Sequence, residues 1–176
     1  FFPRLLADGH GGVFMAWHDG PSGSTRFDVY LQRLTASGDI APGWPSDGVL
    51  VAPVLFPTVS RQASVTLVSD GAGGVLLTWY SYVDTTRRVF AQRVGSDGVI
   101  GAGWPTGGVA VCSAAGHQRM PRSCSDGDGG LIVTWQDGRG LSSDIYAQRL
   151  RGDGTRATAW PADGMALCTA SGEQTH

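Results

Sequence analysis

The sequence lacks lysine and asparagine altogether, and Glu173 is its single glutamate. All 13 basic residues are therefore arginines, and 14 of the 15 acidic residues are aspartates. Lysine and glutamate favour the surfaces of helices, so their scarcity argues against long helices and coiled coils. Only 16% of the residues are charged, which is too few for an ordinary disordered chain.

A strong charge of one sign and long apolar runs are also missing. The net charge is −2, which removes the electrostatic case for binding nucleic acid or an anionic membrane surface. No apolar run approaches the roughly 20 residues that a membrane-spanning helix requires, so no membrane insertion is predicted. The chain begins at Phe1 without an initiator methionine or a signal segment. We therefore expect an exported chain that was trimmed or excised from a longer one.

Catalytic signatures are absent as well. The sequence contains no CxxC pair, no P-loop, no G-x-S-x-G turn and no HExxH helix. The histidines share no repeat position; they are His10, His18, His117 and His176. The sequence therefore predicts no catalytic residue and no cofactor.

The sequence does contain one pattern that is repeated three times. Each copy has an Asp-Gly-x-Gly-Gly motif, an apolar stretch ending in Trp, an apolar stretch ending in Gln-Arg, and a Trp-Pro-x-x-Gly motif. The motif aspartates are Asp8, Asp70 and Asp126, so the copies lie 62 and then 56 residues apart. Periods of this length indicate solenoids or propellers. Repeat 1 carries two insertions, around residues 20–24 and 54–57, which we interpret as loops.

The apolar stretches are short and are bounded by Gly, Asp, Ser and Pro, a pattern typical of strands. In the third copy, strands are expected at residues 122–125, 131–135, 145–150 and 165–168. Four short antiparallel strands per repeat describe one blade of a β-propeller. The predicted fold class is therefore all-β, with three four-stranded antiparallel blades of β-propeller type that form part of a larger ring or assembly. The predicted blades span residues 1–61, 62–117 and 118–176.

The sequence pattern of the third copy resembles that of a known family. Met120-Pro121-Arg122, Ser125-Asp126-Gly127, the apolar run 131–135 and Asp144-Ile145-Tyr146 are similar to the blade repeat of TolB-type β-propellers. The longer pattern, which includes Tyr-Ala-Gln-Arg, Trp-Pro and Gly-Met-Ala-Leu-Cys, resembles repeats in large secreted or surface bacterial proteins. The resemblance implies a propeller fold and a bacterial, extracellular or cell-surface location. It implies no particular activity, since propellers host enzymes, lectins and scaffolds alike.

Two sets of tryptophans recur in the repeats. Trp17, Trp79 and Trp135 close the second strand, where a large ring is expected to fill the space between neighbouring blades. Trp44, Trp104 and Trp160 precede proline in the connection before the fourth strand. The second set either covers the outer edge of each blade or stacks on sugars around the propeller, and the latter interpretation predicts a glycan-binding site.

Two aspartates of the third copy suggest either a turn or a calcium site. Asp126 and Asp128 lie in a glycine-rich loop that suits calcium, but His10 and Ala72 replace Asp128 in the other copies, which favours a plain turn.

The arginine of the Gln-Arg motif is expected to form a buried ion pair. A third strand between packed blades is buried on both faces, so its arginine needs an acidic partner. The expected pairs are Arg149 with Asp137 and Arg33 with Asp19. Ser81 stands at the corresponding position of repeat 2, so Arg93 is expected to lack such a partner.

The three cysteines have no metal-binding spacing. Cys112 and Cys168 share a repeat position with Ala52, which predicts a small, buried, apolar role. Cys124 lies in a first strand, and Cys112 is its only candidate disulfide partner.

These patterns predict a non-catalytic β-propeller module that serves as a scaffold, in adhesion or in assembly. A carbohydrate-binding propeller is the alternative, and an enzyme with its site in the channel of a complete ring is the third hypothesis. Propellers close with about 4 to 8 blades, whereas this chain encodes three. We therefore expect further blades of the same polypeptide, or identical chains, to cover the exposed faces at the two ends.

Overall fold

The computed structural model describes residues 3–20, 27–53, 63–83 and 85–174. Within these ranges the chain forms twelve strands and no helix, which confirms the predicted all-β class. The two insertions of repeat 1, predicted as loops around residues 20–24 and 54–57, lie outside the described residues except for Gly20.

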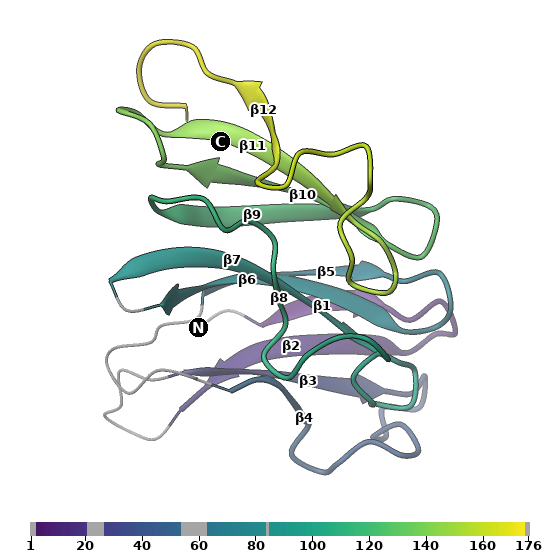
Figure 1. Ribbon diagram of the computed structural model, residues 1–176. Helices are drawn as coiled ribbons and strands as arrows, with labels where there is room; N and C mark the ends of the chain where they lie inside the picture. The colour runs from purple at the N-terminus through teal and green to yellow at the C-terminus, as the bar shows by residue number, and fades with distance from the viewer. Residues whose placement is uncertain (1–2, 21–26, 54–62, 84, 175–176) are drawn as a thin grey trace.

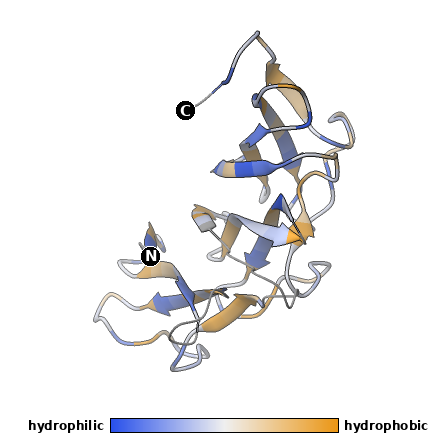
Figure 2. Cartoon of the chain, turned by 90° about the vertical axis from the view of Figure 1, so that its left-hand side faces the viewer, coloured by the Kyte–Doolittle hydropathy of each residue, from blue (hydrophilic) through white to orange (hydrophobic). Residues whose placement is uncertain are grey.

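The strands form three four-stranded antiparallel sheets, as the repeat predicts. Blade 1 consists of β1 (Arg4–Ala7), β2 (Val13–Asp19), β3 (Asp28–Leu34) and β4 (Val49–Ala52). Blade 2 consists of β5 (Ala63–Ser69), β6 (Val75–Val83), β7 (Thr86–Val94) and β8 (Val109–Ala110). Blade 3 consists of β9 (Gln118–Ser125), β10 (Leu131–Asp137), β11 (Asp144–Leu150) and β12 (Met165–Cys168). The blades are stacked in chain order (Figure 1) along an arc that is open on one side (Figure 2), and they do not close into a ring.

The first strand of blade 3 is longer than the sequence predicts. It begins at Gln118 rather than at Arg122 because Pro121, which has no N–H to donate, is absorbed in a β-bulge. At this bulge Met120 has a positive φ of 53°. The strand lies at the edge of its sheet, where a bulge and a proline are tolerated.

Each blade has two faces, and alternate residues of its strands point to each. We call the face toward the earlier blade the preceding face and the face toward the later blade the following face. In β6, Val75 and Leu77 join the apolar cluster shared with blade 1, and Leu76 joins the cluster shared with blade 3. Both faces of blade 2 are therefore buried, which explains why its second strand is apolar without alternation. The first strands β1, β5 and β9 contact one another in turn and form the inner side of the arc.

Candidate functional site

The aspartate of the Asp-Gly-x-Gly-Gly motif anchors the first hairpin of each blade. In blade 2, Asp70 Oδ1 accepts hydrogen bonds from the N–H groups of Ala72 and Gly74, both at 2.8 Å. Asp70 Oδ2 accepts bonds from Nε and Nη2 of Arg93 at 3.0 and 2.8 Å. A Cβ at Gly74 would lie 2.6 Å from both Asp70 Oδ2 and the Val94 carbonyl oxygen, so only glycine fits there. The same arrangement joins Asp8 to Arg33 and Asp126 to Arg149.

These contacts show that the expected ion pairs were wrong. Arg149 binds Asp126 at 2.7 Å rather than Asp137, and Arg33 binds Asp8 at 2.8 Å rather than Asp19. Arg93, which was expected to lack a partner, binds Asp70. The reason is register: Arg149 lies opposite Ile132, five residues along the strand from Asp137. This separation of about 17 Å is too long for an ion pair.

The electrostatics of the turns at Asp8 and Asp126 favour ionised carboxylates, and an arginine stands where the calcium interpretation places a cation. Hydrogen bonds from Arg33 and from the His10 N–H lower the pKa of Asp8 to about 2. Burial raises the pKa of Asp126, but the Asp128 N–H and Arg149 outweigh it, so the net shift is downward. Asp128 Oδ2 lies 3.6 Å from Arg149, so a guanidinium already occupies the place of a cation beside both carboxylates. Among the residues that the structure describes, no group of three His, Cys, Asp or Glu side chains is arranged for a metal ion.

The glutamine of Gln-Arg and the first set of tryptophans hold the last connection of each blade. In blade 2, Gln92 Nε2 donates to the carbonyl oxygen of Pro105 at 2.8 Å. The Trp79 ring packs on Gly108, where an added Cβ would lie 2.7 Å from the ring. Trp79 and Trp135 are buried, whereas Trp17 is only partly buried because it points to the uncovered preceding face of blade 1. These residues therefore pack against the last connection of their own blade, and Trp79 and Trp135 also belong to the apolar clusters shared with the preceding blade.

The Trp-Pro tryptophans lie between blades rather than over an outer edge. Trp44 of blade 1 is buried, and its indole N–H donates to the carbonyl oxygen of Ser96 in blade 2 at 3.0 Å. Arg33 Nη1 donates to the same carbonyl oxygen at 3.1 Å. The ring rests on Gly98, where an added Cβ would lie 3.3 Å from it. One tryptophan and one arginine of blade 1 thus bind one turn of blade 2.

The boundary between blades 2 and 3 repeats these contacts. The buried Trp104 donates its indole N–H to the carbonyl oxygen of Gly152 at 3.0 Å, and Arg93 Nη1 donates to the same atom at 3.4 Å. The Trp104 ring rests on Gly154, where an added Cβ would lie 3.1 Å from it. We call this set of contacts, a tryptophan and an arginine on the turn of the next blade, the interblade latch.

The third member of each set has no blade to bind. Trp160 is only partly buried, and within the described residues its indole N–H makes no hydrogen bond. At the other end of the arc, Gly38 is the counterpart of Gly98 and Gly154, and a Cβ added to it would meet no atom of the described residues within 4 Å. Blade 3 therefore carries the donor side of the latch, with Trp160, and blade 1 carries the acceptor turn, with Gly38. Within the described residues, neither is bound by another blade.

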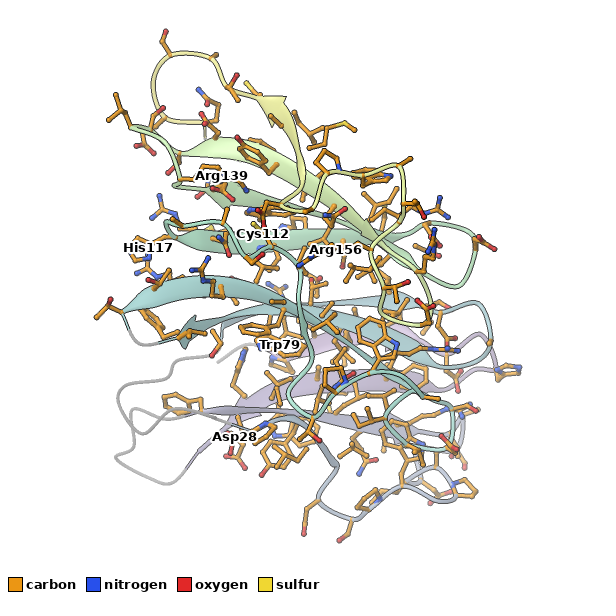
Figure 3. All side chains as sticks on the ribbon, viewed as in Figure 1. Asp28, Trp79, Cys112, His117, Arg139 and Arg156 are labelled. Atoms are coloured by element: carbon orange, nitrogen blue, oxygen red, sulfur yellow. The ribbon has the colours of Figure 1, made fainter. Side chains whose placement is uncertain are left out.

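A second polar cluster joins blades 2 and 3 around Arg139, which lies near Cys112 (Figure 3). Arg139 binds the buried Asp137 at 2.7 Å, and Asp137 also accepts the Trp135 indole N–H at 2.7 Å. Arg139 further donates to the Cys112 sulfur at 3.3 Å, and its guanidinium lies 3.8 Å from the centre of the Tyr146 ring. The hydrogen bond with Asp137 raises the pKa of Arg139, and burial raises that of Cys112. A thiol kept protonated by burial is a poor nucleophile, so this cluster has the chemistry of a structural bridge.

The inner strands line a cavity of about 400 Å³. Its lining residues are Arg4, Leu5, Val65, Thr66, Leu67 and Arg122. The Thr66 hydroxyl is hydrogen-bonded to the hydroxyls of Thr78 and Ser123 at 2.5 and 2.6 Å, which joins blades 2 and 3. Among the described residues, the lining offers two guanidinium groups but no carboxylate or imidazole, and so no general acid–base pair.

The cysteines differ from one another in burial. All three are free thiols, so Cys112 and Cys124 are not bridged. Cys112 is buried as expected, but the expectation of a buried role for Cys168 is wrong: Cys168 is exposed, because none of the described strands packs over that face of blade 3.

Comparison of the chain with protein-family models and with curated proteins finds no match. The TolB-type resemblance therefore stays a prediction, and function has to be argued from the geometry. Among the described residues there is no helix with the length and apolar character needed to cross a membrane.

Proposed function

We propose that this chain is a non-catalytic scaffold and assembly module of the β-propeller type. The observation that carries the proposal is the interblade latch, which occurs at both blade boundaries and uses residues of the repeated motifs. The motif aspartates, glutamines and glycines likewise hold turns within each blade. The repeated part of the sequence therefore serves to build blades and to join them.

The bacterial, extracellular or cell-surface location is part of the proposal and rests on the resemblance of the repeat wording. Fractionation of the source cells followed by mass spectrometry should find the chain in the medium or on the surface. Recovery from the cytoplasm alone would contradict this location.

The glycan-binding alternative required exposed tryptophan rings. Trp44 and Trp104 are buried between blades, so their faces are not available to a sugar. Of the three Trp-Pro tryptophans, Trp160 alone is partly exposed. No observation favours this alternative, but it provides a sharp test of the scaffold proposal.

The test is a glycan array probed with the labelled chain and with Trp160→Ala. Leu141, which is fully exposed on the loop between β10 and β11, supplies a matched control as Leu141→Ala. We expect no saturable glycan binding by any of the three proteins. Saturable binding that survives Leu141→Ala and is lost in Trp160→Ala would overturn the scaffold proposal in favour of a lectin.

A further inference from the structure

The two ends of the arc expose positions that are buried at the internal boundaries. On the following faces, Val51 and Val111 are 1% and 0% exposed, whereas their counterpart Leu167 is 55% exposed. Cys124 and Cys168 are also exposed on the following face of blade 3. This face is therefore built like an internal boundary but is left without a neighbouring blade.

The preceding face of blade 1 shows the complementary pattern. Leu5 is 66% exposed, whereas its counterpart Leu67 packs against the cluster shared by blades 1 and 2. Val13 and Met15 beside it are partly buried, although the corresponding residues of blade 2 are fully buried. Apolar side chains of this kind, grouped on one face, mark an interaction surface.

The acceptor turn on blade 1 has the same conformation as the occupied turns. Gly38, Gly98 and Gly154 have φ angles of 88°, 80° and 83°. Each turn is closed by an equivalent backbone bond, from Gly38 to Thr35, from Gly98 to Gly95 and from Gly154 to Arg151, at 3.0, 3.0 and 2.9 Å. The turn at Gly38 is thus preformed, so little conformational entropy of this turn is lost when a tryptophan binds to it.

We propose that blade 3 of one copy of this chain docks on blade 1 of a second copy through an intermolecular interblade latch. Trp160 donates its indole N–H to the Ala36 carbonyl oxygen, and its ring rests on Gly38. Arg149 donates to the same carbonyl oxygen while it keeps its bond to Asp126. Leu167 packs among the apolar side chains around Leu5.

The occupant is a copy of this chain because both halves of an interface already formed twice within the chain are present and unused at its two ends. The contact is head-to-tail, so a pair of chains that forms it twice closes a six-bladed ring. Six blades fall within the range of about 4 to 8 at which propellers close. The inference rests on the proposed scaffold function and names its partner.

Sedimentation velocity over a concentration series tests the proposal. The purified chain should form a species of twice its 18.4 kDa mass. Trp160→Ala and Leu5→Asp should each weaken this association by about 30-fold or more, as expected for residues at the centre of an interface. Both side chains are accessible in the single chain, so circular dichroism should show an unchanged fold. Leu141→Asp, outside the proposed surface, should associate like the original chain.

Mixing the two defective variants distinguishes a head-to-tail contact from other kinds. Trp160→Ala retains an intact blade 1, and Leu5→Asp retains an intact blade 3, so the mixture should form a heterodimer through one latch at a concentration at which each variant alone is monomeric. A mixture that stays monomeric would overturn the head-to-tail contact. If the original chain instead forms longer open oligomers and both substitutions abolish them, the docking surface would be confirmed but the closed six-bladed pair would be wrong.

Alkylation of the exposed thiols reports on the same face. Cys124 and Cys168 should react at least tenfold more slowly in the associated chain than in Trp160→Ala at the same concentration. A chain that remains monomeric with rapidly alkylated thiols would overturn the second copy as the occupant. That result would leave the scaffold function standing, because the glycan array tests it separately.

Discussion

Replacing Trp104 by alanine removes the ring that joins blade 2 to blade 3, and we expect it to lower the free energy of unfolding by about 3 to 5 kcal/mol. The ring is 6% exposed, and it packs on Gly154 of the next blade. Loss of the hydrogen bond to Gly152 accounts for about 1 kcal/mol of that cost. The same substitution at Trp160, in protein dilute enough to be monomeric, should cost less than about 1 kcal/mol because no blade covers that ring.

Urea unfolding followed by far-UV circular dichroism measures both losses without relying on tryptophan fluorescence. With a slope near 2 kcal/mol per molar urea, Trp104→Ala should lower the midpoint by about 2 M, and Trp160→Ala should lower it by less than about 0.5 M. Trp104→Phe retains an aromatic ring but loses the N–H donor, so its midpoint should lie between those of Trp104→Ala and the original chain. Equal losses at Trp104 and Trp160 would refute the reasoning, because the presence of a following blade is the main difference between the two sites.

Three further outcomes follow from the hairpin anchors. Asp70→Leu and Arg93→Met should each cost about 2 to 4 kcal/mol, and the double variant should lose less than the sum; additive losses in the double-mutant cycle would disprove the pairing. Gly74→Ala should destabilise the chain more than Gly71→Ala, because the Cβ at Gly74 would meet two oxygens at 2.6 Å, whereas alanine at Gly71 adds backbone strain at a φ of 73° but meets no described atom within 4 Å; thermal unfolding compares them, and an equal effect would count against the close packing. The pKa of Asp8 is lowered to about 2, so its ion pair stabilises the fold above about pH 4 and is lost as the pH falls toward 2; Asp8→Asn should flatten this acid loss in unfolding measurements, and an unchanged pH profile would contradict it.

The sequence predicted the three sheets because strand patterning and turn residues are local signals. It did not reveal the partner of Arg149, since that partner depends on the register between strands. The sequence did contain a usable signal. The arginine occurs in all three repeats, and so does an aspartate at the position of Asp126. The position of Asp137, in contrast, is occupied by Ser81 in repeat 2. A partner needed in every copy should itself occur in every copy.

The role of the Trp-Pro tryptophans was harder to predict for a different reason. The interblade latch joins positions in successive repeats, and the pattern within one repeat carries no trace of such a contact. The exposure of Cys168 was missed on the same ground. Its repeat position is buried only where a later blade follows, so identical positions in a repeat can have different environments at the end of an array.

The exchange rates of the indole protons test the interblade latch most directly. In a nitrogen-15 NMR experiment on the Leu5→Asp chain, which we expect to be monomeric, each indole N–H gives its own signal. The account predicts slow hydrogen exchange at Trp44 and Trp104, whose N–H groups bond to Ser96 and Gly152 of the next blade, and fast exchange at Trp160. Exchange at Trp44 and Trp104 as fast as at Trp160 would show that the blades are not joined in this way.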